Sequence, residues 1–160
     1  MRHGSRLVAA LAAALISLPL AGAAPAPSPA QVPHGVAVRV AVTALRNHHG
    51  VVMACMTTNE GRFPRCRGDT ASYRANVSAG GAPETLVITF PDVRPGTYAI
   101  ALLHDENGNG RADKAAMIPR EGFGFSRDAR VRMGPPTFDD AAFSVGSEPV
   151  QQTIRMRYML

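Results

Sequence analysis

The sequence predicts an all-β protein, an antiparallel two-sheet sandwich of about seven strands, immunoglobulin-like or transthyretin-like in arrangement. Short runs in which apolar and polar residues alternate recur along the chain. Most runs are bounded by Gly, Pro, Asn or Asp, which are residues that form turns. Beyond residue 34, no stretch shows the long, capped apolar period of a helix.

The first expected strand is 36–43, where Val at every second position alternates with Ala, Arg and Thr. This period of two is typical of a strand with one buried face. Further strands are expected at 51–56, 73–77, 86–90, 98–103, 142–145 and 153–158.

The N-terminal segment is typical of a cleaved secretory signal peptide. Arg2 and Arg6 precede the apolar run 7–20, and an A-x-A cleavage site ends at Ala23. A membrane anchor is the alternative, but the run is shorter than the ~20 residues that a spanning helix needs, and Pro19 interrupts it. We therefore expect a periplasmic or secreted protein with no transmembrane anchor after cleavage.

This segment sets the expected domain organisation. A signal peptide, 1–23, precedes a linker rich in Pro and Ala, 24–34, whose composition favours an extended spacer. The remainder, 35–160, has the size of one domain with a single core.

The charge of the chain argues against nucleic acid as a partner. Lys and Arg number 17 against 12 Asp and Glu, and the excess of five falls to three when Arg2 and Arg6 leave with the signal. The basic residues are scattered rather than clustered on one segment, as a nucleic-acid surface would require.

Cys55 and Cys66 are the two cysteines of the chain. In an oxidising compartment we expect them to form a disulfide, which in the loop-entropy account stabilises the fold by about 2–3 kcal/mol. A metal pair or a catalytic thiol is less favoured, because the spacing is not C-x-x-C and no His-rich segment accompanies it.

The stretch 104–113, HDENGNGRAD, contains a D-x-N-x-N-G-x-x-D pattern. Oxygen-bearing residues at alternate positions of a curled loop point to one centre, as calcium requires. The predicted metal ligands are the side chains of Asp105, Asn107, Asn109 and Asp113 and the backbone carbonyl of Arg111. This set falls short of the ~6–8 oxygens of a calcium site, which predicts a dissociation constant near ~10⁻⁴–10⁻³ M.

The same loop has two alternative interpretations. An EF-hand is excluded, because Ala116 stands where that loop has its bidentate Glu and the flanks are not helical in pattern. A plain hairpin turn stays open, since Asn-Gly is itself a strong turn signal.

Other side chains are candidates for the surroundings of this loop. Glu121 and Asp139 would complete a metal shell or form a general acid–base pair if their segments fold over the same end, with His104 as a further candidate. Exposed acids on loops are otherwise simply solvated. Gly122 and Gly124, which flank Phe123, indicate either a close approach of backbone to a ligand or a bulged edge strand.

Three segments together carry a family resemblance. They are PGTYAIALLHDENGNG at 95–110, IPREGFGFS at 118–126 and GPPTFDDAAF at 134–143. In this order they resemble an uncharacterised family of exported bacterial proteins, domain of unknown function 2141, whose pattern also has a final strand ending in Tyr. The resemblance implies an exported β-sandwich and no established activity. The chain departs from the pattern at Met117, where the family tends to have Gly, and in its cysteine pair.

Two classes of function follow. The first is a non-enzymatic binding or structural module of the bacterial envelope, with a glycan, peptide or protein ligand and a calcium site in the loop. The alternative is a small periplasmic hydrolase that uses loop carboxylates or His104. The chain has no G-x-S-x-G nucleophile elbow, and we assign no catalytic residue.

Overall fold

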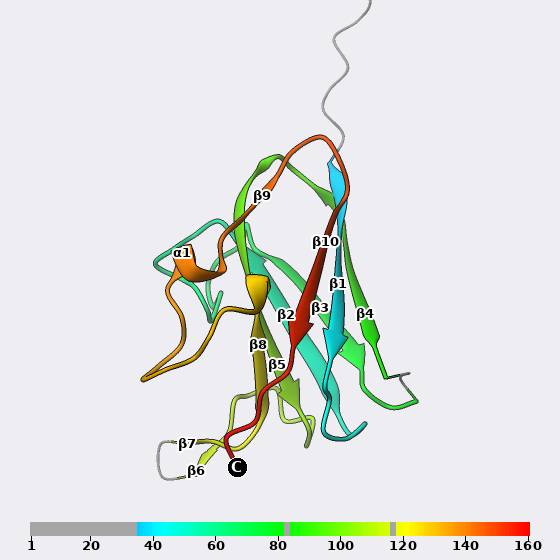
Figure 1. Ribbon diagram of the computed structural model, residues 1–160, viewed down its shortest axis with the longest axis vertical. Coiled ribbons are helices and arrows are strands. Elements are labelled where there is room, and N and C mark those ends of the chain that lie inside the picture. The colour runs from blue at the N-terminus through cyan, green and yellow to red at the C-terminus, as the bar shows by residue number, and fades with distance from the viewer. Residues whose placement is uncertain (1–34, 82–83, 116–117) are drawn as a thin grey trace, which may run out of the picture. The chain divides into compact units, whose positions relative to one another are not determined.

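The computed structural model describes residues 35–81, 84–115 and 118–160 (Figure 1). The expected signal peptide and linker lie outside these residues. The described part forms two β-sheets and a small hairpin, which confirms the predicted all-β sandwich.

The first sheet has the strand order β10-β1-β4, from Val150–Arg155, Val36–Thr43 and Leu86–Val93. β1 and β4 pair antiparallel, whereas β1 and β10 pair in parallel, with Val42 opposite Ile154. The sandwich is therefore mostly rather than wholly antiparallel. The period of two that identified these strands carries no information about which strand pairs with which, or in which direction.

The second sheet is built around one long central strand, β5. Its strand order is β3-β2-β5-β8, from Tyr73–Ser78, Val51–Thr57, Gly96–Asp105 and Gly122–Phe125. A further strand, β9 (Phe143–Val145), pairs with the beginning of β5. The short hairpin of β6 (Lys114–Ala115) and β7 (Ile118–Pro119) follows the loop after β5.

Alternate residues of the facing strands make the core. Val38, Val40 and Val42 of β1 are completely buried, as the alternation predicts. The opposing sheet contributes inward residues from β2 and β5, namely Val52, Ala54, Met56, Tyr98, Ile100 and Leu102.

A second apolar cluster covers the outer face of β5. It includes Ala99, Ala101, Phe125 and Phe138, so β5 is buried on both faces. Phe138 belongs to a four-residue helix, α1 (Phe138–Ala141), and a 3-10 turn, η1 (Ser126–Asp128), lies beside it. A reciprocal pair of bonds between Thr137 and Asp140 starts α1, a capping box that the sequence analysis missed.

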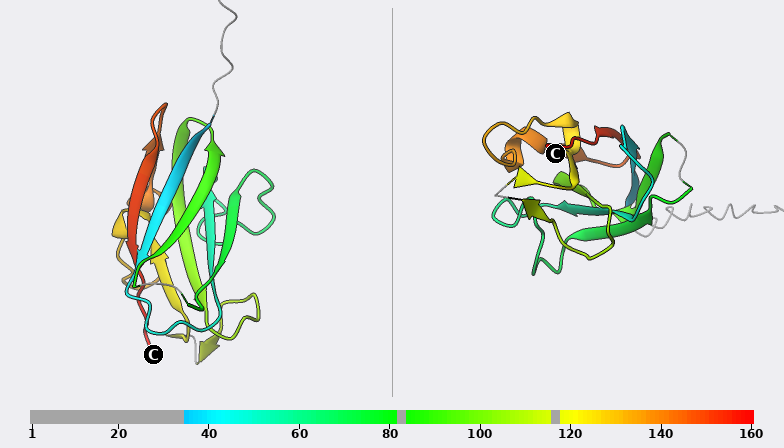
Figure 2. Two further views of the ribbon diagram at one scale, coloured as in Figure 1. Left: turned by 90° about the vertical axis from the view of Figure 1, so that its right-hand side faces the viewer. Right: turned by 90° about the horizontal axis from the view of Figure 1, so that it is seen from below.

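The two ends of the sandwich differ. The long strands run along the length of the sandwich, and the β6–β7 hairpin and the C-terminus lie together at one end of it (Figures 1 and 2). β5 also ends there, so its last residues and the loop that follows meet the C-terminal tail.

Candidate functional site

The loop after β5 begins with a buried carboxylate. Asp105, the last residue of β5, is 1% exposed, and its oxygens accept the N–H groups of Asn109 at 3.1 Å and Gly110 at 2.6 Å. Gly108 and Gly110 take a positive φ, which glycine adopts without the steric penalty of a side chain. The chain therefore curls around the carboxylate of Asp105.

The other predicted ligands brace the same turn. The Nδ2 groups of Asn107 and Asn109 both donate to Oδ2 of Asp113, each at 2.8 Å. Their Oδ1 atoms accept backbone N–H groups, Asn107 that of Asn109 at 3.1 Å and Asn109 that of Arg111 at 2.8 Å. The structure thus gathers the predicted side chains into one hydrogen-bonded loop, with Arg111 exposed at its surface.

Glu121 reaches this loop from the chain beyond the β6–β7 hairpin. It is 4% exposed, and its Oε2 accepts the N–H of Asp113 at 3.1 Å. Its Oε1 is buried and has no hydrogen-bond partner among the described residues. Burial raises the pKa of Glu121, and the bond from Asp113 opposes the rise. The charges of Asp105 and Asp113, and a hydrogen bond that protonated Glu121 can share with the Asp105 side chain, add to the rise. A buried carboxylate oxygen without a donor is unfavourable, so this part of the loop lacks a partner when Glu121 is ionised.

Asp139 lies elsewhere in the fold. It is exposed on α1 and borders a shallow hollow of about 320 Å³ together with Glu60 and Phe63. α1 packs over the middle of β5, away from the end that carries the loop (Figure 1). In the ranges 35–81, 84–115 and 118–160, no three His, Cys, Asp or Glu side chains are grouped as a metal centre would need. A cation at the loop would therefore need amide or carbonyl oxygens as well.

His104 points to the opposite side of β5 from Asp105, because successive strand residues alternate between faces. It is completely buried, with Nε2 2.8 Å from the carbonyl oxygen of His49 and Nδ1 2.8 Å from the hydroxyl of Tyr158. A carbonyl only accepts, so Nε2 carries a proton, and Nδ1 shares a hydrogen bond with the hydroxyl of Tyr158. Both ring nitrogens are therefore engaged in holding the fold.

A cluster around Tyr158 was not foreseen from the sequence. The Nε and Nη2 of Arg46 donate to the two carboxylate oxygens of Glu106 at 2.8 and 2.5 Å, and its guanidinium carbon lies 4.5 Å from the centre of the Tyr158 ring. The bond from Arg46 lowers the pKa of Glu106, and burial raises the pKa of Tyr158. No local pattern links residues so far apart in sequence; the single available signal was the closing Tyr of the family pattern.

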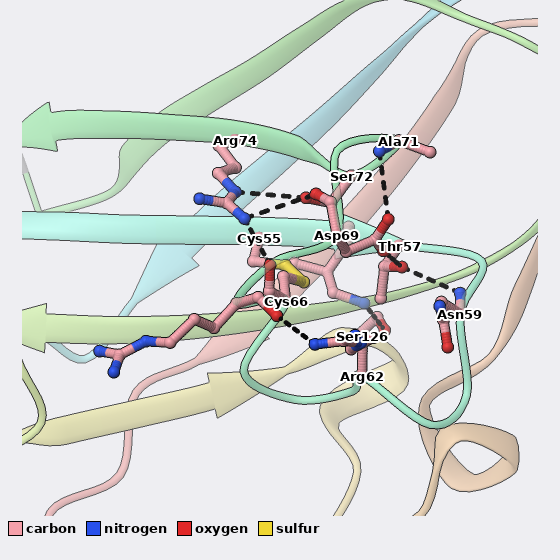
Figure 3. Close-up of a disulfide and its surroundings, with 12 residues drawn as sticks. Cys55, Thr57, Asn59, Arg62, Cys66, Asp69, Ala71, Ser72, Arg74 and Ser126 are labelled. Atoms are coloured by element: carbon pink, nitrogen blue, oxygen red, sulfur yellow. Dashed lines mark hydrogen bonds between the residues drawn. A yellow bond between two sulfur atoms is a disulfide. The ribbon is translucent and has the colours of Figure 1, made fainter.

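A disulfide lies on the outer face of the second sheet. Cys55 on β2 and Cys66 form the predicted disulfide (Figure 3). Beside it, the buried hydroxyl of Thr57 donates to Asp69 at 2.5 Å and accepts the N–H of Asn59 at 2.9 Å. The connection between β2 and β3 is thus held both by the disulfide and by paired polar groups.

The glycines of β8 face the interior. A Cβ on Gly122 would overlap the ring of Tyr158, and one on Gly124 would overlap Ile154. β8 lies at the end of the strand order of the second sheet. It pairs with β5 in a continuous register, so the predicted bulge is absent from this pairing. The two glycines therefore make room for the C-terminal segment.

Comparison with known proteins completes these observations. The described residues contain no helix with the length and hydrophobicity needed to cross a bilayer. Searches of curated proteins and of solved structures each returned no match. The family described as "Uncharacterized protein conserved in bacteria (DUF2141)" matches residues 40–153, which confirms the resemblance seen in the motifs. The chain belongs to this bacterial family.

Proposed function

We propose that this protein is a non-enzymatic β-sandwich module of the bacterial envelope whose loop 105–113 binds calcium together with Glu121. The observation that carries the proposal is the buried Oε1 of Glu121, which has no hydrogen-bond partner in the part of the chain that the structure describes and lies beside the carboxylate of Asp105. Two adjacent buried carboxylates repel one another, and a cation between them would supply the missing partner.

The oxygen donors around this point suit a hard cation. Asp105 and Glu121 offer adjacent carboxylates, and Asn107 and Asn109 offer amide oxygens, which in the structure accept backbone N–H groups. Calcium accepts this mixture and tolerates irregular geometry, with water completing the shell. A dissociation constant near ~10⁻⁴–10⁻³ M would suit an extracellular or periplasmic module rather than a cytosolic sensor.

Export is supported by the signal-like N-terminus and by the disulfide, since disulfides persist in oxidising compartments. The ligand of the module would be a glycan, a peptide or a protein of the envelope. The alternative of a hydrolase is less well supported, because His104, Asp105 and Glu121 are each at most 4% exposed. A general acid or base must come within about 3 Å of its substrate, and these side chains are covered.

Thermal unfolding in calcium and in EDTA tests the proposal. At a calcium concentration about tenfold above the dissociation constant, we expect the melting temperature to rise by roughly 4–7 °C. Glu121→Gln should abolish the rise and, by removing a buried charge, should not lower the melting temperature in EDTA. Glu60→Gln, which removes the same charge from an exposed site, should keep the full rise.

Two results would contradict the calcium site. One is identical melting of the unaltered protein in calcium and in EDTA. The other is an undiminished calcium response in Glu121→Gln, which would place the binding elsewhere.

A further inference from the structure

The C-terminal tail, residues 156–160, docks at the end of the sandwich that carries the proposed cation site. Phe123 and Arg157 exchange backbone hydrogen bonds at 2.9 Å in both directions, so the tail covers the edge of β8. The N–H of Met156 donates to the carbonyl of Thr43 at 2.9 Å, and the guanidinium of Arg46 bonds the carbonyl of Leu160. The tail is thus an integral part of this end.

Asp105 stands between two residues that hold this tail. His104, which precedes it, is bonded to the hydroxyl of Tyr158 at 2.8 Å. Glu106, which follows it, binds Arg46 through both carboxylate oxygens, and Arg46 stacks on the Tyr158 ring. A displacement of Asp105 would therefore move both supports of Tyr158.

The two sequence neighbours of Glu121 also contact Arg46 and Tyr158. The carbonyl of Arg120, before it, accepts a bond from Nη2 of Arg46 at 2.9 Å. Gly122, after it, packs directly against the ring of Tyr158. Both proposed carboxylate ligands thus have neighbours on each side that contact the same two side chains, Arg46 and Tyr158.

We propose that cation binding and tail docking are coupled, so that calcium fastens residues 156–160 onto the edge of β8. This inference rests on the cation site proposed above. A cation shared by Asp105 and Glu121 fixes the two backbone segments whose neighbours form the docking surface of the tail. Without the cation, the repulsion between the two carboxylates acts to separate those segments. By linkage, the docked tail increases the cation affinity by the same factor.

Amide hydrogen exchange of the purified protein in calcium and in EDTA tests the first half of the coupling. We expect calcium to slow exchange about tenfold in the loop 105–113 and in the tail. The two amides that join the tail to β8, those of Phe123 and Arg157, should slow as well. The disulfide-closed connection 58–72 serves as the internal reference, where local exchange should change little.

The variant Arg46→Gln tests the effect of tail docking on cation affinity. It removes the side chain that joins Glu106, Arg120 and Tyr158, and we expect calcium binding measured by calorimetry to weaken about tenfold. Simple electrostatics predicts the opposite sign, because losing a nearby positive charge strengthens the attraction of a cation. Arg39→Gln, on the exposed face of β1, should leave the affinity unchanged.

The outcomes separate the two proposals. Calcium binding that protects the loop but leaves tail exchange unaltered, or an Arg46→Gln variant that binds calcium as tightly or more tightly, overturns the coupling and leaves the site intact. An absence of calorimetric binding with no change in loop exchange overturns the calcium site and the coupling together.

Discussion

The two long connections that leave the central strands of the second sheet are stabilised in opposite ways. The connection after β2 is closed by the Cys55–Cys66 disulfide, and the buried hydroxyl of Thr57 is paired with Asp69. The loop after β5 has no covalent closure, and a buried oxygen of Glu121 has no donor among the described residues. The first connection is therefore complete in itself, whereas the stability of the second depends on what the solution supplies.

Removal of the disulfide is the largest expected change. With Cys55 and Cys66 both replaced by Ala, we expect the free energy of unfolding to fall by about 2–3 kcal/mol, because the unfolded chain regains the entropy of the open loop. Urea unfolding of the variant measures this loss. The calcium-dependent rise in melting temperature should persist in the variant, and its disappearance would show that the two connections are not independent.

The hydroxyl of Ser126 gives the next largest effect. Ser126 is completely buried, accepts the N–H of Ile100 at 2.9 Å and donates to the carbonyl of Ala141 at 2.5 Å. It thereby fills the gap in the β5 ladder between the pairings with β8 and β9. Ser126→Ala should destabilise the fold by about 1–3 kcal/mol in urea unfolding, since a buried N–H is left unpaired.

Ser144→Ala is the matched control for that change. Ser144 is exposed on β9, so its hydroxyl is free to bond with water, and we expect little loss of stability. Equal losses in the two variants would mean that the hydroxyl of Ser126 does not hold the ladder.

The smallest expected effect is a pH dependence that belongs to the incomplete loop alone. Burial, with nearby carboxylates, raises the pKa of Glu121 above its ordinary value of 4.5, so the folded state keeps this proton to higher pH than the unfolded chain. In EDTA, the stability that the proton on Glu121 contributes is fully present at pH values below 4.5. It is lost as the pH rises above 4.5 and passes through the raised pKa of the folded state. Melting temperatures across this window should show a decline that Glu121→Gln removes and Glu60→Gln retains; an equal decline in all three proteins would assign the titration to another group.

Alternation of apolar residues was enough to predict most of the strands. The first strand was predicted at its observed bounds, the strand around Val52 one residue short, and the strand around Ile100 two residues short at each end. The last strand was expected at 153–158 but occupies Val150–Arg155, because Met156 continues the apolar period after the pairing with β1 has ended. The parallel pairing of β1 and β10 follows from the tertiary fold and leaves no local trace.

The grouping of the candidate ligands could be predicted only where the residues are close in sequence. Asp105, Asn107, Asn109 and Asp113 share one loop, so their spacing was enough to expect them together. Glu121 and Asp139 were equal candidates for the same cluster. The fold brings Glu121 to the loop and places Asp139 on α1, and nothing in the local sequence of either residue indicates this difference. The contact between Arg46 and Tyr158 joins residues 112 positions apart, beyond the reach of any periodicity.

The backbone pairing of Phe123 with Arg157 has a consequence for self-association. An unpaired strand at the margin of a sheet is a template on which a second molecule can extend that sheet, and folded proteins protect such margins. Here the protection of β8 comes from the final few residues of the chain, held by the Phe123–Arg157 bridge, the backbone bond from Met156 to Thr43 and the side chains of Arg46 and Tyr158. A proteolytic cut after Arg155 would remove the cover of β8 together with Met156, which is 2% exposed and belongs to the core. We therefore expect such a truncation to expose the edge of β8 and to favour association between molecules.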